Sequence, residues 1–280
     1  MIFFNTKQIK EILISSGFSK VGITSFDIAK NNLKSTNNKE QIPNNAKSII
    51  VGLIPYFSDK IKGQNISSYA VCKDYHLIAK EFLDKSINAL KELFPNNSFV
   101  GFCDNSPFDE VQIAVKSGLG VKGSNNLLIT KEFGSYVFIS EIVSDLELII
   151  KNQYCDCEKC FACVKACPNG ALSLKKDKVI FKKENCISYI SQKKGALSQK
   201  EQLSIKKSNL IWGCDICIDT CPHNNNLKPC GLGLENDLLY VLKEDDIKNL
   251  SNSEFLQKYK QRAFSWRGKE TIFRNIKILD

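Results

Sequence analysis

Cysteine is the residue type that dominates the possible chemistry of this 280-residue chain, since ten of its 12 cysteines lie within residues 155–230. Clustered cysteines in a chain without secretory features indicate metal ligation or redox chemistry rather than structural disulfides. The first group has the spacing C-x2-C-x2-C-x3-C-P that bacterial ferredoxins use to hold a [4Fe-4S] cluster, a pattern that zinc or chance explains poorly. Its members are Cys157, Cys160, Cys163 and Cys167, followed by Pro168.

A second, incomplete motif follows, with the spacing C-x2-C-x3-C-P at Cys214, Cys217 and Cys221. Cys186 lies 28 residues upstream of this motif and can replace its missing first cysteine through a loop. In two-cluster ferredoxins the fourth cysteine of each motif binds the other cluster. This rule predicts two ligand sets: Cys157, Cys160, Cys163 and Cys221 for cluster 1, and Cys167, Cys186, Cys214 and Cys217 for cluster 2.

Four cysteines remain outside these sets. Cys155 is either an alternative ligand or, as we expect, a bystander. Cys72 and Cys230 are interpreted as surface or core thiols. Cys103 ends a predicted strand, where a small buried hydrophobe is the simplest interpretation.

Asp104 is the candidate acid, because it lies between a predicted strand at 98–103 and a predicted helix. Ser106 as N-cap and Pro107 at the first helical position indicate that helix start. A carboxyl group in this place can face a crevice and donate a proton, or it can simply cap the helix. Position alone favours the second alternative, helix capping.

The two histidines allow fewer conclusions. Asp74 and His76 begin a D-x-H-x-x-G pattern that binds cobalt in some corrinoid proteins, but Ala79 replaces the glycine and excludes the match. His76 therefore lines a pocket or packs at a helix start. His223 is expected at the surface or beside a metal site.

The elements that must position these residues indicate an α+β or α/β chain. Five apolar runs predict strands, at 20–25, 48–54, 98–103, 126–130 and 136–144. Helices are predicted at 5–18, 69–94, 106–117, 235–250 and 252–264, and the segment FRNIKIL (273–279) closes the chain. The cysteine distribution predicts domain boundaries near residues 150 and 230.

Charge and hydropathy narrow the classes of function. The net charge is +9, from 39 basic and 30 acidic residues, and the lysine excess is typical of an AT-rich genome. The only arginines are Arg262, Arg267 and Arg274, and such a cluster could bind a polyanion. No apolar run is long enough for a membrane helix, and no signal peptide is recognisable, so we expect a cytoplasmic protein without membrane contact.

The order of motifs resembles the epoxyqueuosine reductase family, from about Gly17 to Asn275. The cysteine set is the most specific part, including the lone Cys186 followed by Ile-Ser-Tyr. Further matching segments are GFSKVGI (17–23), NAKSIIVGLIPYF (45–57), YAVCKDYH (69–76), FCDNSPFDE (102–110), SGLGVKG (117–123), GSYVFISEIVSD (134–145) and FRNIKIL (273–279).

The resemblance implies a cobalamin-dependent oxidoreductase that reduces epoxyqueuosine to queuosine in tRNA. It implies an N-terminal cobalamin-binding α/β domain over 1–150, a ferredoxin-like domain with two [4Fe-4S] clusters over 151–230, and a short helical segment over 231–280. Asp104 falls on the family's proton donor. The implied cobalamin contacts are His76, Asp104, Leu128, Ile139 and Ser188. It also implies arginines that face tRNA phosphates. A monomer is the default expectation, and we expect an external electron donor such as a flavodoxin or ferredoxin.

The chain departs from the family pattern around the expected cofactor region. The family's G-L-G-W-[IV]-G-K becomes GLGVKGS at 118–124, without the tryptophan. Ser140 replaces a glycine and Lys193 replaces a glutamate, while residues 30–44 are short and polar. Longer members carry C-terminal helical repeats, which we do not expect within these 280 residues. Two alternatives therefore remain: a related reductase with another substrate, and a two-cluster electron carrier.

Overall fold

The computed structural model describes residues 6–30, 33–34, 37–148, 150, 157–229, 234 and 237–280. The chain divides into two compact units. The first comprises residues 1–55 and 76–158, and the second comprises residues 56–75 and 159–280. Residues 56–75 thus group with the cysteine-rich part of the chain, which no sequence feature indicates.

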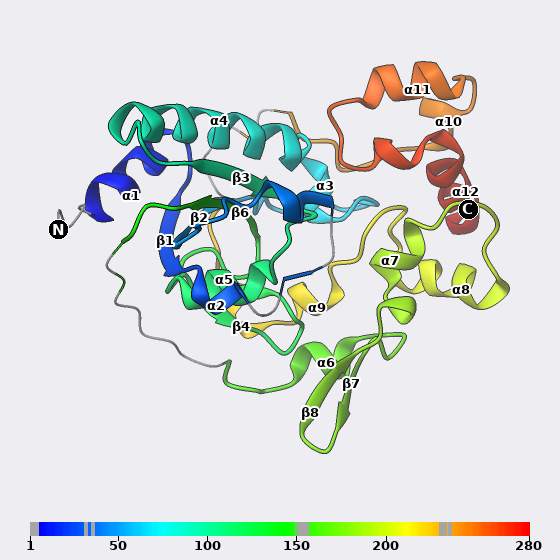
Figure 1. Ribbon diagram of the computed structural model, residues 1–280. Helices are drawn as coiled ribbons and strands as arrows, with labels where there is room; N and C mark the ends of the chain where they lie inside the picture. Colours follow the sequence, from blue (N-terminus) through cyan, green and yellow to red (C-terminus); the bar gives the residue numbers. More distant parts are fainter. Residues whose placement is uncertain are drawn as a thin grey trace. The chain divides into compact units, whose positions relative to one another are not determined.

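A four-stranded antiparallel sheet forms the centre of the first unit (Figure 1). Its order is β1-β2-β6-β3, with β1 at Lys20–Ser25, β2 at Ser48–Pro55, β6 at Val137–Ser144 and β3 at Phe99–Cys103. All eight residues of β2 are buried, because this strand has a neighbour on both sides and helices on both faces. The continuous apolar run SIIVGLIP follows from this position.

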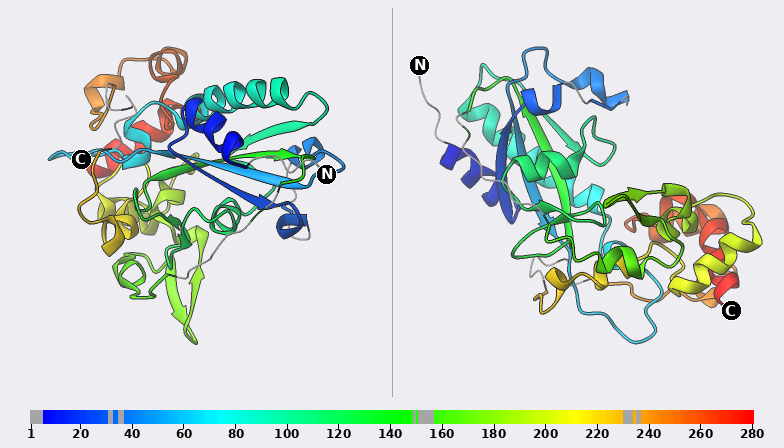
Figure 2. Two further views of the ribbon diagram at one scale, coloured as in Figure 1. Left: turned by 90° about the vertical axis from the view of Figure 1, so that its left-hand side faces the viewer. Right: turned by 90° about the horizontal axis from the view of Figure 1, so that it is seen from below.

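Helices cover both faces of this sheet, as the edge-on view in Figure 2 shows. On one face lie α1 (Thr6–Ser15) and α4 (Tyr75–Leu93), and Gly101 of β3 packs closely against Leu83 and Ile87 of α4. On the other face α5 (Glu110–Lys116) shares an apolar core with Val51 and Phe102, which we call the α5-side core. The unit is completed by α2 (Asp27–Lys30), η1 (Asn37–Gln41), β4 (Val121–Lys122) and β5 (Leu128–Ile129).

Short helices and one hairpin make up the second unit. Its main apolar core joins the C-terminal helices to Ile66 and to Trp212, which lies two residues before Cys214. The elements are α3 (Ser68–Val71), α6 (Ala162–Ala166), β7 (Leu172–Lys175), β8 (Lys178–Phe181), η2 (Lys183–Asn185), α7 (Ile187–Ser191), α8 (Gln199–Ser208), α9 (Ile216–Asp219), η3 (Pro222–Asn224), α10 (Glu244–Ile247), α11 (Asn252–Tyr259), η5 (Ser265–Arg267) and α12 (Lys269–Leu279).

Two helix predictions were wrong in part, because backbone groups in these segments form hydrogen bonds with residues outside the predicted helix. The helix predicted at 69–94 is interrupted between α3 and α4, where the Asp74 N–H donates to the Gln261 carbonyl at 2.7 Å. The helix predicted at 235–250 is confined to α10 within the described residues. Before it, the Leu239 N–H donates to the Val71 carbonyl, and the Asn65 side chain bonds both backbone groups of Leu242.

The helix predicted to begin at Ser106 starts later in the structure. Its N-cap is Asp109, whose carboxylate accepts the Gln112 N–H at 3.2 Å. Ser106 is buried instead, with its hydroxyl turned to Glu141. Among the described residues, none of the helices is both long enough and apolar enough to cross a membrane.

Candidate functional site

Asp104 directly follows β3 and is held in an unusual backbone conformation. Its φ is 53°, and that of Asn105 is 42°, so two consecutive non-glycine residues lie in the left-handed region. The Asn105 N–H donates to Asp104 Oδ1 at 2.8 Å. Helix capping belongs to Asp109, so the capping interpretation of Asp104 was wrong. The side chain of Asp104 is 55% exposed and is therefore accessible to a ligand.

His76 meets Asp104 from the first turn of α4. Its Nε2 lies 3.3 Å from Asp104 Oδ2, and its side chain is 48% exposed. Both side chains reach the surface of the first unit from different elements, one from a helix start and one from a strand end. The structure therefore brings together an imidazole and a carboxyl that are 28 residues apart in the sequence.

The other three predicted cofactor contacts are placed differently. Leu128 of β5 is only 2% exposed and belongs to the α5-side core, and Ile139 of β6 packs against that core. Ser188 lies in α7 of the second unit, where its carbonyl accepts the Ser191 hydroxyl at 3.0 Å. None of these contacts is tested by the structure, so they stay predictions.

Two further carboxyls, the buried Glu141 and the half-buried Glu110, lie in the same region as Asp104, and sequence reasoning missed them as site residues. Glu141 of β6 is fully buried opposite Phe102 of β3. Burial, with a smaller effect of the Glu110 charge, raises the pKa of Glu141 to about 8. Burial and the Asp104 charge raise the pKa of Glu110 to about 7. The signal for Glu141 was its position as the only charged residue in the apolar run YVFISEIVS at 136–144.

Two of the remaining thiols lie in the described part of the chain, Cys103 half-buried and Cys72 buried. Burial raises the pKa of the Cys103 thiol to about 12, and the nearby carboxylates add to this shift. Cys103 is therefore a protonated thiol rather than a nucleophile. Cys72 is buried in the second unit, at 2% exposure. Cys155 and Cys230 lie outside the described residues, and His223 is exposed in η3.

The four cysteines predicted to bind cluster 2 lie near one another in the second unit. Cys167 follows α6, Cys186 precedes α7, and Cys214 and Cys217 lie before and within α9. Burial raises the pKa of Cys214 to about 12, and the charges of Cys186 and Cys167 contribute. The pKa of Cys217 is also raised by burial and then by its cysteine neighbours. Such buried thiols become thiolates only beside positive charge, which a bound iron cluster supplies.

Backbone donors complete the surroundings of these thiols. The Leu172 N–H donates to Cys167 Sγ at 3.5 Å, and a backbone hydrogen bond from Ile216 lowers the pKa of Cys214. Hydrogen bonds of this kind tune cluster potentials. Within the described ranges, no three His, Cys, Asp or Glu side chains converge on a point that would hold one metal ion. The ligands of a four-iron cluster bind separate irons, so they need not converge in that way.

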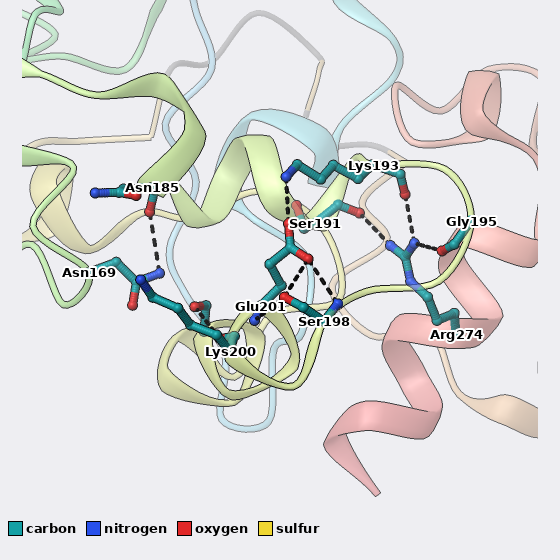
Figure 3. A network of polar contacts seen from close by, with 10 residues as sticks. Asn169, Asn185, Ser191, Lys193, Gly195, Ser198, Lys200, Glu201 and Arg274 are labelled. Atoms are coloured by element: carbon teal, nitrogen blue, oxygen red, sulfur yellow. Dashed lines mark hydrogen bonds and ion pairs between the residues drawn. The ribbon is translucent and has the colours of Figure 1, made fainter.

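The expectation that the C-terminal arginines face phosphates was wrong for two of them. Arg274 of α12 donates to the carbonyls of Lys193 and Gly195 at 2.7 and 2.5 Å, and more weakly to that of Ser191 (Figure 3). It thereby fixes the segment after α7, where Lys193 also pairs with Glu201. Burial lowers the pKa of Arg274.

Arg262 is likewise occupied, by the carbonyls of Val71 and Asp237 and by the Asp237 carboxylate. Arg267 differs from both, because its guanidinium stacks on the Trp266 ring at 3.6 Å. Trp266 is 58% exposed. An exposed aromatic ring with a stacked cation is a surface that a nucleobase can cover.

Two family models match the chain over ranges that contain the predicted cluster ligands and the pair of His76 and Asp104. Residues 156–224 match the model of a 4Fe-4S double cluster binding domain, which supports two [4Fe-4S] clusters. Residues 37–105 match the model of "Epoxyqueuosine reductase QueG, DUF1730". The predicted α/β fold with a ferredoxin-like part is confirmed by the structural matches described next.

Two curated relatives and one solved structure illustrate the similarity. An epoxyqueuosine reductase of Cyclobacterium marinum is 37% identical over 66% of this chain and 60% of that protein. One of Cellulophaga algicola is 31% identical over 84% of this chain and 77% of that protein. A crystal structure of epoxyqueuosine reductase with a tRNA-Tyr epoxyqueuosine-modified stem loop has a TM-score of 0.83 at 26% identity, covering 98% of this chain and 80% of that one. The chain spans less than two thirds of the length of several relatives, between 54% and 60%.

Proposed function

Because this chain belongs to the epoxyqueuosine reductase family, we propose that it reduces epoxyqueuosine to queuosine in tRNA. The observation that carries the proposal is the exposed pair of Asp104 and His76 in a chain that also contains a double cluster domain. A solved relative was crystallised with an epoxyqueuosine-modified tRNA stem loop. An epoxide needs a proton donor that substrate can reach, and Asp104 is such a group.

The reaction adds two electrons and two protons to the epoxide, breaks both carbon–oxygen bonds, and releases water to leave an alkene. Two [4Fe-4S] clusters and cobalamin, when bound, supply the electron transfer, with electrons from an external one-electron donor such as a flavodoxin or ferredoxin. The predicted ligand sets of eight cysteines hold the clusters. Asp104 donates the proton to the departing oxygen.

The residues around Asp104 fit a bound cobalamin in one respect. His76 Nε2 is directed to the Asp104 carboxylate, so this imidazole orients the acid instead of binding a metal. Ala79, where a corrinoid lower-ligand motif needs glycine, is fully buried in α4. In our proposal His76, Asp104, Leu128, Ile139 and Ser188 would hold the corrin, and the cofactor would supply electrons for the reduction.

We include three further points in the proposal. The functional division is a cobalamin-binding part over 1–150, a cluster part over 151–230 and a helical segment over 231–280. The protein acts as a cytoplasmic monomer. The tRNA is bound through the basic surface and through Trp266 and Arg267, because Arg262 and Arg274 are occupied by internal carbonyls.

The test combines a binding and a turnover measurement on the intact chain after anaerobic cluster reconstitution. We expect the EPR signal of added cob(II)alamin to change stoichiometrically with protein, and we expect epoxyqueuosine tRNA to yield queuosine by mass spectrometry. A changed cobalt signal without queuosine would assign another substrate to the same site. An unchanged cobalt signal with both clusters present would indicate an electron carrier and contradict the proposal.

A further inference from the structure

Glu141 is a fully buried carboxyl that the proposed chemistry does not use. It lies in the middle of β6, and its register neighbours are Val51 of β2 and Phe102 of β3, both in the α5-side core. The Ser106 hydroxyl donates to Glu141 Oε2 at 2.5 Å. Glu141 Oε1 has no hydrogen-bond partner among the residues that the structure describes. An ionised carboxylate in this place would leave a charge in an apolar core with half of its acceptors unused.

The charged surroundings of Glu141 do not compensate such a charge. Glu110 and Asp109 face it from the start of α5, and Cys103 lies near it on β3. Lys34, whose N–H donates to the Pro107 carbonyl, is the cation that favours ionisation. Burial is nevertheless the dominant effect, and it raises the pKa of Glu141 to about 8. Glu141 is therefore a neutral acid at neutral pH.

Ser106 connects this buried acid to Asp104. Its oxygen donates to Glu141 and also accepts the Phe108 N–H at 3.2 Å, which fixes the turn over residues 106–108. That turn directly follows Asp104 and Asn105, the two residues with left-handed backbone. Asp and Asn tolerate the left-handed region better than other non-glycine residues, but two in succession are stabilised by contacts around the turn. The buried bond from Ser106 to Glu141 is one such contact.

We propose that Glu141 is a positioning residue for Asp104, which, as a neutral acid bonded to Ser106, holds the Asp104 turn (residues 104–108) in place. Ionisation of Glu141 would strengthen its bond to Ser106 but put an uncompensated charge in the apolar core, and hydration of that charge would open the turn to water. Asp104 then loses its orientation toward His76. The inference rests on the proposed function only for its effect on turnover, since the position of the turn can be measured without substrate.

The test is amide hydrogen exchange of the cluster-loaded chain, followed by mass spectrometry of peptides that cover residues 104–108. Rates are divided by the intrinsic exchange rates at each pH. In the wild type we expect protection of the Asp104 turn to fall about tenfold between about pH 7 and about pH 9, as the neutral fraction of Glu141 falls. Glu141→Gln keeps the shape and the Ser106 acceptor but cannot ionise, so its protection should not change with pH.

Ser106→Ala is the second variant, and it removes the bond without leaving a large cavity. We expect the Asp104 turn of Ser106→Ala to be poorly protected already at about pH 7. In turnover assays, the activity of the wild type should fall above about pH 8, whereas the activity of Glu141→Gln should not. Equal protection in all three proteins, or a pH-dependent loss in Glu141→Gln, would overturn the inference. The predicted exchange pattern in a protein that does not reduce epoxyqueuosine tRNA would support Glu141 and contradict the proposed function.

Discussion

The sheet of the first unit and the cysteine-rich segment of the second are stabilised in different ways. Strand β2 of the sheet is completely buried between neighbouring strands and helices. The hydrophobic effect therefore accounts for the stable structure of this region. The segment from Cys157 to Cys186 contributes few buried apolar side chains. None of its helices or strands is longer than five residues. It carries five of the eight predicted cluster ligands, so we expect its order to depend on bound iron. The first region should therefore tolerate loss of iron, and the second should not.

Loss of one ligand should produce the largest effect. Cys217→Ala removes a predicted cluster 2 thiolate from α9, so we expect iron to fall from about eight to about four atoms per chain. The second unit should lose hydrogen-exchange protection, because cluster assembly is coupled to folding. The sheet should keep its protection. Iron content and exchange of the reconstituted protein measure both effects.

Cys72→Ala is the matched control, because it removes a thiol of the same unit that lies outside the predicted ligand sets. Its iron content should equal that of the wild type. The same outcome is expected for Cys103→Ala in the first unit. Full iron content in Cys217→Ala would refute the ligand assignment.

The second largest effect should come from the exposed acid. Asp104→Asn removes the proposed proton donor but keeps its size, so turnover should fall by roughly 10²–10⁴-fold with both clusters intact. Asp109→Asn is the control five residues away. Asparagine is as good an N-cap as aspartate, and turnover should stay within a few-fold. Similar activity in the two variants would show that Asp104 is not the donor.

The two regions also differ in how well their helices and strands could be predicted from the sequence. The strands β1, β2, β3 and β6 were predicted nearly to their ends, because long apolar runs have few alternatives to a buried strand. In the second unit the hairpin β7–β8 and helix α8 were missed. Both are short or polar elements, and their apolar pattern is weak.

The site was predictable to a similarly uneven degree. Cysteine spacing predicts ligand chemistry directly, and the place of Asp104 at a strand end predicts an accessible acid; both assignments stay predictions. The contact of His76 with Asp104 depends on how α4 packs on the sheet, which the sequence does not encode locally. The roles of Arg262 and Arg274 depend on carbonyls that are between 25 and 191 residues away.

A third prediction concerns the pH dependence of the sheet region. The pKa of Glu141 is raised from 4.5 to about 8, so the folded state binds this proton more tightly than the unfolded chain does. The stabilisation is complete below about pH 4.5 and is lost as the pH rises to about 8. Chemical denaturation between about pH 6 and about pH 8 should show stability falling with pH. Glu141→Gln should reduce this slope, and an unchanged slope would place the titration elsewhere.

The smallest effect should appear at the surface of the second unit, where neither iron nor the core is involved. Trp266→Ala removes the exposed ring on which Arg267 stacks, so we expect weaker binding of tRNA by about 1–3 kcal/mol, with iron content unchanged. Trp266→Phe should retain part of the affinity because a face for stacking remains.

Phe181→Ala, which removes another exposed aromatic ring of this unit, should bind as the wild type does. Equal losses in Trp266→Ala and Phe181→Ala would mean that the affinity follows exposed apolar area in general, and that Arg267 on Trp266 has no special role. A loss of affinity in the Trp266 variant alone, with full iron content, would show that tRNA binding and iron binding in the second unit depend on different residues.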